Sequence, residues 1–243
     1  FFLYLPFTSP HKPVIPLPAF RGQGKAGAYG EFMIETDYHV GRLLDYLDQA
    51  GLSKNTLVIF TSDNGPENTW KERAPKYQHQ SNGIYREGKR SIYEGGHRVP
   101  FIIRWPAQVK AGRTWNQPVC QTDILATCAE LTNATLPANA GEDSVSFLDV
   151  LTEKNQQPER PPMIHHSSQG RYAIRAGKWK LVMESRREKK RELYDLETDP
   201  RESRNVLKQH PETARKLAEQ ITAIVNRGRT TAGPAVENDT PWW

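Results

Sequence analysis

Apolar residues recur along the 243-residue chain at two spacings, one typical of helices and the other of strands. From residue 29 to residue 50 they mark one face of a helix, and Gly51 follows as the expected stop. Short runs rich in β-branched and aromatic residues predict strands, and a second helical stripe follows them. These segments are strands at residues 1–5, 57–60 and 101–104 and a helix near residues 123–131. Their order predicts an α/β layered domain with a largely parallel sheet.

A different pattern begins beyond residue 162. Residues 172–175 and 178–183 alternate apolar with polar positions on either side of Gly177, which predicts a hairpin, and residues 192–196 predict a third strand. A helical stripe covers residues 211–226, with Pro at its start and Gly228 at its stop. We therefore expect a small antiparallel sheet packed by one helix.

Composition places a domain boundary between these two patterns. Residues 152–162 are polar and proline-rich, as linkers are. The predicted organisation is an α/β domain at residues 1–151, a linker at 152–162, a small α+β subdomain at 163–228 and a loose tail at 229–243. With 37% hydrophobic residues, the chain has enough apolar side chains for a real core.

Charge favours anionic ligands in general, but not nucleic acid. Lys and Arg total 33 against 28 for Asp and Glu, which gives a net charge of +5 and an isoelectric point near 9.1. The densest charge run, residues 186–191, includes an acidic residue and no interleaved aromatics, and this predicts a solvated hairpin tip. No stretch approaches the length of a membrane span. We expect no nucleic-acid partner and no membrane span.

Two segments carry the residues that could do chemistry. Asp63 and Asn64 follow the predicted strand at residues 57–60 after two intervening residues, and a carboxylate beside an amide carbonyl offers the hard oxygen donors that Ca²⁺ or Mg²⁺ prefers. Taken alone, Asp-Asn-Gly is most often a simple turn. The second segment holds Lys89, followed at residues 93–101 by Tyr-Glu-Gly-Gly-His-Arg-Val-Pro-Phe. Its glycines predict a sharp backbone turn before the next strand.

These motifs resemble those of formylglycine-dependent sulfatases, the arylsulfatase-like branch of the alkaline phosphatase superfamily. The resemblance begins with Phe-Leu-Tyr-Leu-Pro-Phe at residues 2–7 and Pro-His-Lys-Pro at 10–13, and it ends with Glu-Leu-Tyr-Asp-Leu-Glu-Thr-Asp-Pro at 192–200. An ordered series of matches is far more specific than any one motif. The resemblance implies an alkaline-phosphatase-like α/β fold, incomplete at the N-terminus, and hydrolysis of an aryl or carbohydrate sulfate ester.

The resemblance also implies roles for four residues. Asp63 and Asn64 would complete a divalent-cation site, most often for Ca²⁺, with Mg²⁺ as the alternative. Lys89 would contact the sulfate and the ester oxygen, since a compact ammonium suits a small tetrahedral anion. His11 would lie near the leaving group and protonate it. The alternative for His11 is a histidine that only packs among the prolines of its loop.

The sulfatase nucleophile motif, Cys or Ser followed by any residue, Pro or Ala, any residue and Arg, has no match in the chain. Residues 120–124 and 128–132 do not fit, and residues 167–171 match only at the ends. The simplest expectation is a fragment, inactive alone, without the N-terminal half that supplies the formylglycine and further metal ligands in the family. The resemblance implies a periplasmic or secreted protein, although these residues hold no targeting signal.

Two other functions stay open on the sequence. A phosphodiesterase or phosphonate hydrolase of the same superfamily would use a transition-metal site with His ligands, and Asn64 argues against it. A non-catalytic module that binds sulfated glycans would keep the affinity without turnover. Residues 66–87 carry aromatic and basic side chains, are expected at the mouth of the site, and suit a sulfated sugar as well as an aryl ester. The substrate, the metal and the oligomeric state are not set by the sequence.

Overall fold

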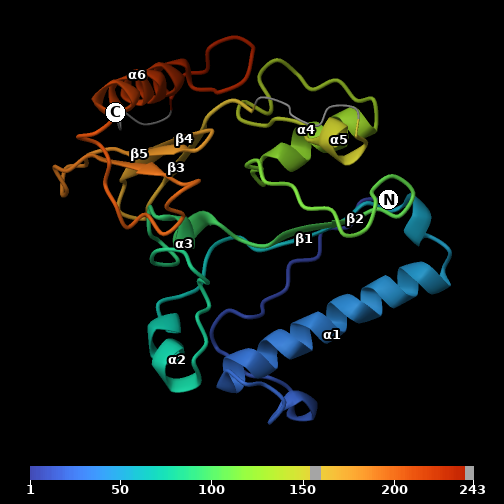
Figure 1. Ribbon diagram of the computed structural model, residues 1–243. Coiled ribbons are helices and arrows are strands. Elements are labelled where there is room, and N and C mark those ends of the chain that lie inside the picture. Colours follow the sequence, from blue (N-terminus) through green and yellow to red (C-terminus); the bar gives the residue numbers. More distant parts are fainter. Residues whose placement is uncertain (154–159, 239–243) are drawn as a thin grey trace.

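The computed structural model describes residues 1–153 and 160–238 and builds them around two separate antiparallel sheets (Figure 1). The first sheet pairs β1 (Val58–Thr61) with β2 (Phe101–Arg104). The second has four strands in chain order, β3 (Met163–His166), β4 (Tyr172–Ala176), β5 (Trp179–Val182) and β6 (Glu192–Asp195). The α-helices of the described residues are α1 (Gly27–Gln49), α2 (Trp70–Tyr77), α3 (Glu94–His97), α4 (Asp123–Leu131), α5 (Leu148–Leu151) and α6 (Pro211–Arg227).

The first region packs helices against one face of the β1–β2 pair. Val58 lies opposite Arg104 and Thr61 lies opposite Phe101 in this pair. Apolar side chains from one face of both strands pack against the buried residues Phe147, Val150 and Leu151 in and before α5. Since side chains alternate along a strand, this arrangement buries one face and leaves Ile102 on the other, where it is exposed. Helix α1 runs along the other side of this region and ends before Gly51, which has a φ of +70° (Figure 1).

The N-terminal part of the sequence prediction is wrong. Residues 1–5 form no strand, and their large side chains are exposed, with Phe1 and Phe2 more than four-fifths accessible. A run of apolar residues becomes a strand only when a neighbouring strand satisfies its backbone groups, and in this part of the described chain only β1 and β2 pair. That pair is antiparallel, so the largely parallel sheet expected for residues 1–151 is not formed among the described residues.

The second region is a four-stranded sheet with a core on each face. Ile174, Leu181 and Leu193 face α6 and meet its buried residues Leu217 and Ile221. The alternate strand positions point to the other face. There Ala173, Val182 and Tyr194 pack against Ile92, which lies two residues before α3. Figure 1 shows α6 and α3 on opposite sides of the sheet. The C-terminal sheet therefore lies between its own helix and the chain that leads into α3.

Most of the other predicted elements are confirmed. The expected hairpin, third strand and final helix correspond to β4, β5, β6 and α6, and Gly228 ends α6 with a φ of +70°. Residues 186–190, in the expected solvated tip between β5 and β6, are exposed. The sequence indicated a strand end at His165 and His166, where β3 ends, but it did not predict the short helices α2, α3 and α5. Helices of one or two turns give almost no periodic signal.

The proposed linker and tail lie partly outside the described residues. Helix α5 ends at Leu151 and β3 begins at Met163, which brackets the predicted linker at residues 152–162, but residues 154–159 fall outside the description. Residues 239–243 of the predicted tail do so as well. The boundaries of the domains stay a prediction. Across the described ranges, no helix combines the length and the apolar character needed to cross a membrane.

Candidate functional site

The turn after β1 holds the two predicted metal ligands. The Asn64 side chain donates a hydrogen bond to the Gly65 carbonyl at 2.9 Å, and the Ser62 hydroxyl donates one to the Asn64 carbonyl at 3.3 Å. Asp63 is exposed and takes part in no hydrogen bond or ion pair with the described residues. The turn is thus shaped by its neighbours, while the Asp63 carboxylate keeps its oxygens available.

Backbone hydrogen bonds join this turn to residues 86–97, which we call the Lys89 segment. The Gly65 N–H donates to the Gly96 carbonyl at 3.1 Å, and the Lys89 N–H donates to the Pro66 carbonyl at 2.9 Å. The contact is so close that a Cβ on Gly65 would lie 1.8 Å from the Gly95 carbonyl oxygen. The two segments singled out in the sequence therefore form one unit.

The Lys89 ammonium is not neutralised by direct contact. Lys89 is half-buried and forms no side-chain hydrogen bond or ion pair within the described ranges. Its neighbour Arg90 pairs with Glu67 at 2.7 Å. The Arg90 hydrogen bond, a backbone N–H and the nearby charges of Arg90 and Lys89 lower the pKa of Glu67 to about 2. The ammonium thus lies near a carboxylate that already has a partner, and its donors remain free for an anion.

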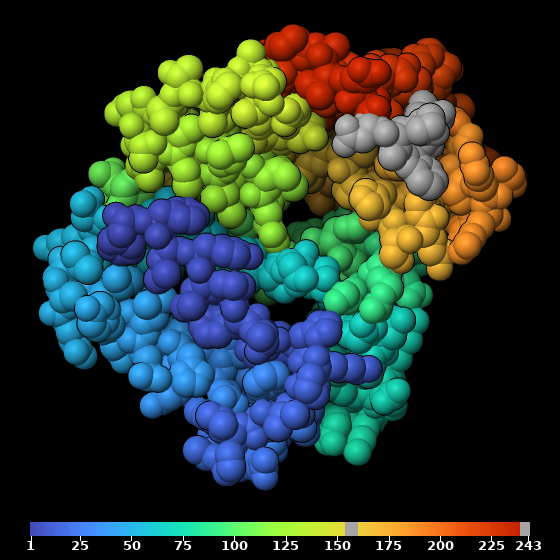
Figure 2. Space-filling view, turned by 180° about the vertical axis from the view of Figure 1, so that it is seen from behind, coloured from blue at the N-terminus to red at the C-terminus, as the bar shows by residue number. Residues whose placement is uncertain are grey.

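His11 lies in an exposed loop and has only local contacts. Its Nδ1 lies 2.8 Å from the Lys12 carbonyl oxygen. The loop is tied to α1 by a hydrogen bond of 2.5 Å from the Thr36 hydroxyl to Ser9. Figure 2 shows the N-terminal segment crossing the face of the molecule next to the cyan residues around β1, with a hollow beside them. Among the described residues, no hydrogen bond or ion pair joins His11 to Asp63 or Lys89, so its role stays a prediction.

The two predicted ligands fit a hard divalent cation in kind but not in number. A carboxylate and an amide carbonyl are suitable donors for Ca²⁺ or Mg²⁺, yet these ions take about six oxygen ligands. Within the described ranges, no group of three or more His, Cys, Asp or Glu side chains could hold a metal. Asp63 and Asn64 can therefore supply part of a cation site, and further oxygen donors would have to complete it.

Comparison with known proteins decides the family. The family described as Sulfatase matches residues 1–134, which is more than half of the chain. A second family, described as the C-terminal region of N-sulphoglucosamine sulphohydrolase, matches residues 83–227. The chain belongs to the sulfatase family.

Curated relatives and solved structures agree with this assignment. An N-acetylgalactosamine-6-O-sulfatase of Bacteroides thetaiotaomicron is 36% identical over 244 residues, covering 93% of this chain and 47% of the relative. A steryl-sulfatase of Mus musculus is 36% identical over 177 residues, covering 72% of this chain and 28% of the relative. A solved structure from work on the metabolism of multiple glycosaminoglycans by Bacteroides thetaiotaomicron superposes with a TM-score of 0.82 at 35% identity, covering 90% of this chain and 48% of the other. These neighbours support the alkaline-phosphatase-like fold class, and the chain spans about half the length of the first of these relatives.

The sulfatase chain also contains a buried charge cluster that the sequence did not reveal. We use this name for Glu94, Arg175, Lys180 and Glu202. The Lys180 ammonium lies 3.0 Å from a Glu94 oxygen and 2.9 Å from a Glu202 oxygen, and Arg175 lies 3.1 Å from Glu94. Lys180 and Glu202 are both 0% exposed. Alternation along β5 could have placed Lys180 opposite the Leu181 face, but no local pattern shows which residues it meets.

The electrostatics of the charge cluster differ between its two carboxylates. Burial acts to raise the pKa of Glu94, but the adjacent Lys180 and Arg175 outweigh it and hold that pKa below its usual value. Burial raises the pKa of Glu202, although Lys180 and a backbone N–H oppose the change. Glu94, which has the larger number of cationic neighbours, is thus the firmly ionised member.

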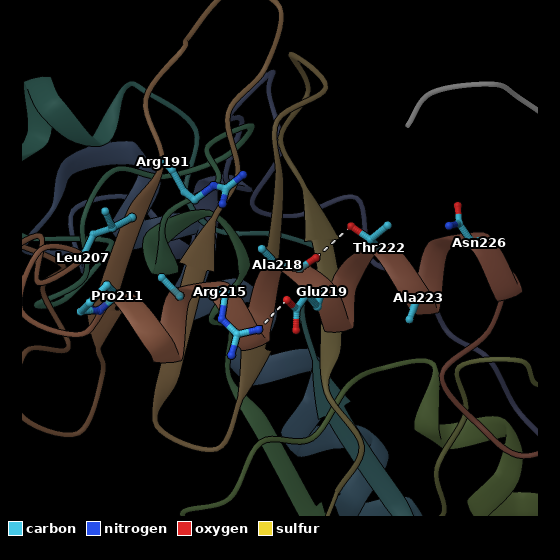
Figure 3. Close-up of a pocket in the computed structure, with 10 residues that line it drawn as sticks. Arg191, Leu207, Pro211, Arg215, Ala218, Glu219, Thr222, Ala223 and Asn226 are labelled. Carbon is cyan, nitrogen blue, oxygen red and sulfur yellow. Dashed lines mark hydrogen bonds and ion pairs between the residues drawn. The ribbon is translucent and has the colours of Figure 1, made fainter.

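A groove on the surface of this sulfatase chain lies away from the site. It has a volume of about 670 Å³ and runs along α6 beside Arg191 and Leu207 (Figure 3). An ion pair of 2.7 Å between Arg215 and Glu219 lies in its wall. None of its lining residues comes from the turn after β1 or from the Lys89 segment. Volume alone does not identify the place of the chemistry.

Proposed function

We propose that this chain is the part of a sulfuric ester hydrolase that binds the sulfate group and assists the departure of the alcohol. The main support is the backbone connection between the turn of Asp63 and Asn64 and the segment of Lys89. A cation-binding turn and a free ammonium held beside each other form a site for a tetrahedral dianion or its monoester. The family assignment makes sulfate the anion to test first.

In this proposal, each residue has a stated task. Asp63 and Asn64 hold Ca²⁺, or alternatively Mg²⁺, together with oxygen donors from elsewhere. When bound, the cation neutralises charge on the sulfate oxygens. The Lys89 ammonium donates hydrogen bonds to the sulfate and to the ester oxygen, where negative charge builds as the S–O bond breaks. His11 donates a proton to the departing alcohol.

The attacking group must come from outside this 243-residue chain, because no segment of it matches the nucleophile motif of formylglycine-dependent sulfatases. The proposed activity therefore belongs to a longer protein in which a formylglycine supplies the nucleophile. We infer a periplasmic or secreted location for that protein from its family.

For the substrate, we propose a sulfated carbohydrate. The relative that covers 93% of this chain is an N-acetylgalactosamine-6-O-sulfatase. Trp70 on α2 lies next to Gly88, the residue before Lys89, and Arg73 on the same helix places its guanidinium 3.8 Å from the Tyr29 ring centre. Sugar rings stack on aromatic faces, and cations attract sulfate groups. An aryl sulfate is the simpler alternative substrate.

The test is an assay of the complete reading frame that contains these residues. The protein should hydrolyse nitrophenyl sulfate or a 6-O-sulfated amino sugar faster than nitrophenyl phosphate. Lys89→Ala should lower kcat for the sulfate ester by about 10²- to 10³-fold, as the loss of one transition-state donor does. The control is Lys178→Ala, which removes only a surface lysine in the turn between β4 and β5, paired with Asp195 at 2.9 Å. Full activity of Lys89→Ala, or faster turnover of the phosphate ester, would contradict the proposal, and binding of sulfated glycan without turnover would indicate a non-catalytic module.

A further inference from the structure

The buried charge cluster joins the C-terminal sheet to the segment that carries Lys89. Lys180 lies on β5 and faces away from α6, because its neighbours Leu181 and Trp179 lie on the α6 face. On that opposite face it meets Glu94, the first residue of α3, and Glu202, which follows β6 in the chain. The contact with Glu94 spans 86 positions of the chain, so residues far apart in the sequence meet at one ammonium.

Glu202 holds both ends of the Lys89 segment. Its carboxylate accepts a hydrogen bond of 2.6 Å from the Glu94 N–H. Its backbone carbonyl accepts one of 3.1 Å from the Arg86 guanidinium, which also donates to the Tyr194 hydroxyl at 3.1 Å. Lys89 lies between these two attachment points. The segment is therefore held by the same glutamate at the Glu94 backbone and at the Arg86 side chain.

The same attachment reaches the turn of Asp63 and Asn64. The Gly95 N–H donates to the Arg86 carbonyl at 2.9 Å, which closes the Lys89 segment on itself. The next residue, Gly96, accepts the hydrogen bond of 3.1 Å from Gly65. Lys180 is thus connected to the turn after β1 through its ion pair with Glu94, the backbone of α3 and the hydrogen bond from Gly65.

We propose that Lys180 and Glu202 are positioning residues of the site, which hold the Lys89 segment and the turn of Asp63 and Asn64 at their mutual spacing from the C-terminal sheet. The inference deepens the proposed function and rests on it for its meaning in catalysis. Neither residue touches substrate. They act through the Glu94 backbone and the Arg86 side chain, and these two residues flank Lys89 in the chain.

Physical chemistry explains why an ionic attachment serves this task. A buried ion pair adds little net stability compared with well-packed apolar residues, because desolvation of the charges costs as much as their attraction returns. Ionic contacts are directional, whereas apolar packing is not. An ammonium with carboxylate oxygens at 2.9 Å and 3.0 Å allows few other arrangements of the three residues. Loss of the lysine also leaves the Glu202 carboxylate without its cationic partner beside Glu94, which keeps Arg175 at 3.1 Å, and the segment must move to relieve this.

The test measures hydrogen exchange on the chain itself. In Lys180→Met, amides in residues 63–66 and 86–97 should exchange at least about tenfold faster than in the wild type, because local opening of these segments becomes easier. Glu202→Gln, which keeps the shape and one acceptor oxygen, is the second variant in case Lys180→Met does not fold. It should raise exchange in the same segments by a smaller factor.

Two controls separate positioning from general loss of stability. Leu217→Ala removes a buried side chain from the α6 face of the same sheet and should lower the Tm at least as much, without raising exchange at residues 63–66. Lys178→Met removes a half-exposed lysine that pairs with Asp195 at 2.9 Å and should change neither quantity. Equal exchange in Lys180→Met and the wild type, or equal acceleration in Lys180→Met and Leu217→Ala, overturns the proposal.

An activity measurement links the inference to catalysis. In the complete protein, Lys180→Met should lower kcat for a sulfate ester by about tenfold or more, while Leu217→Ala stays within about twofold at a temperature where both are folded. A wild-type protein without sulfatase activity would refute the proposed function, and the exchange experiment would still decide the positioning role. Normal kcat in a Lys180→Met protein with fast exchange would refute the link between position and catalysis.

Discussion

Gly65 lies where the turn after β1 meets α3, and there is no room for a side chain at this position. Its N–H donates to the Gly96 carbonyl, and a Cβ would lie 1.8 Å from the Gly95 carbonyl oxygen. Both of these neighbours are backbone, so neither can turn aside as a flexible side chain would. The close approach is what allows the two segments to share hydrogen bonds.

Substitution of Gly65 tests this contact. Gly65→Ala should lower the free energy of unfolding by about 1 to 3 kcal/mol or more, because the methyl group forces the turn and α3 apart. The control is Gly41→Ala in the middle of α1, where a Cβ meets nothing within 4 Å. There alanine should raise stability by up to about 1 kcal/mol, since it has the higher helix propensity. Urea titrations of both variants measure the difference, and equal stabilities would contradict the close contact.

At the scale of elements, α6 shows how the C-terminal sheet is held. The helix begins at Pro211, ends before Gly228 and turns Ala214, Leu217 and Ile221 to the sheet. These positions are three or four residues apart, which is the spacing of one helical face. The opposite face carries Arg215 and Glu219, which are exposed and paired at 2.7 Å. Packing of the apolar face, rather than the surface ion pair, stabilises the helix.

The two faces of α6 should therefore respond differently to truncation. Ile221 is 0% exposed, so Ile221→Ala should cost about 2 to 5 kcal/mol through lost burial and the cavity left behind. Glu219→Ala should cost about 0.5 kcal/mol or less, because it removes only an exposed pair. Thermal unfolding followed by circular dichroism gives both values. A similar loss in the two variants would mean that α6 is not packed as described.

At the scale of the whole molecule, His97 of α3 and His165 of β3 lie side by side where α3 meets the C-terminal sheet. The rings of His97 and His165 have centres 4.5 Å apart, and neither Nε2 has a hydrogen-bond partner in the described chain. Burial and the positive charge of Lys180 lower the pKa of His97 to about 4, and they lower that of His165 as well. Both rings are neutral in the folded protein near pH 7.

This pair makes stability depend on pH in a definite direction. Between about pH 6.5 and pH 4 the unfolded chain binds a proton at His97 that the folded chain does not, so stability falls as the pH is lowered. The raised pKa of Glu202 opposes this trend, and the lowered pKa of Glu94 adds to it only at more acidic pH. Above pH 6.5 the histidine contribution is constant.

The prediction concerns the slope of stability with pH, not its absolute value. From pH 7 to pH 5 the wild type should lose about 2 kcal/mol more than His97→Gln, which cannot bind the proton in either state. Leu217→Ala should lower stability equally at both pH values, because no titratable group is removed. Denaturant titrations at the two pH values measure the slopes. Equal slopes for the wild type and His97→Gln would show that His97 is not buried as a neutral group.

Much of the fold follows from local spacing, while the site depends on distant contacts. The helical stripes of α1 and α6 and the alternation of β4 and β5 lie within one segment each, so the sequence alone predicts them. The first region differs from the prediction because an apolar run does not show which strand it pairs with. Asp63, Asn64 and Lys89 could be selected because each belongs to a motif, and their roles stay predictions. No motif in the sequence indicates that Lys180 contacts Glu94 and Glu202.

The hydrogen bond between Lys89 and Pro66 closes the intervening stretch into a loop whose two ends meet. Helix α2 and most of the aromatic and basic side chains beside the site lie inside that loop, whereas its base is held independently through Gly65 and Arg86. Exposed side chains of this loop can therefore change without breaking the backbone hydrogen bond at its base. Under the proposed function, this stretch is where selectivity among sulfated molecules would vary, while the base that carries Lys89 keeps its shape.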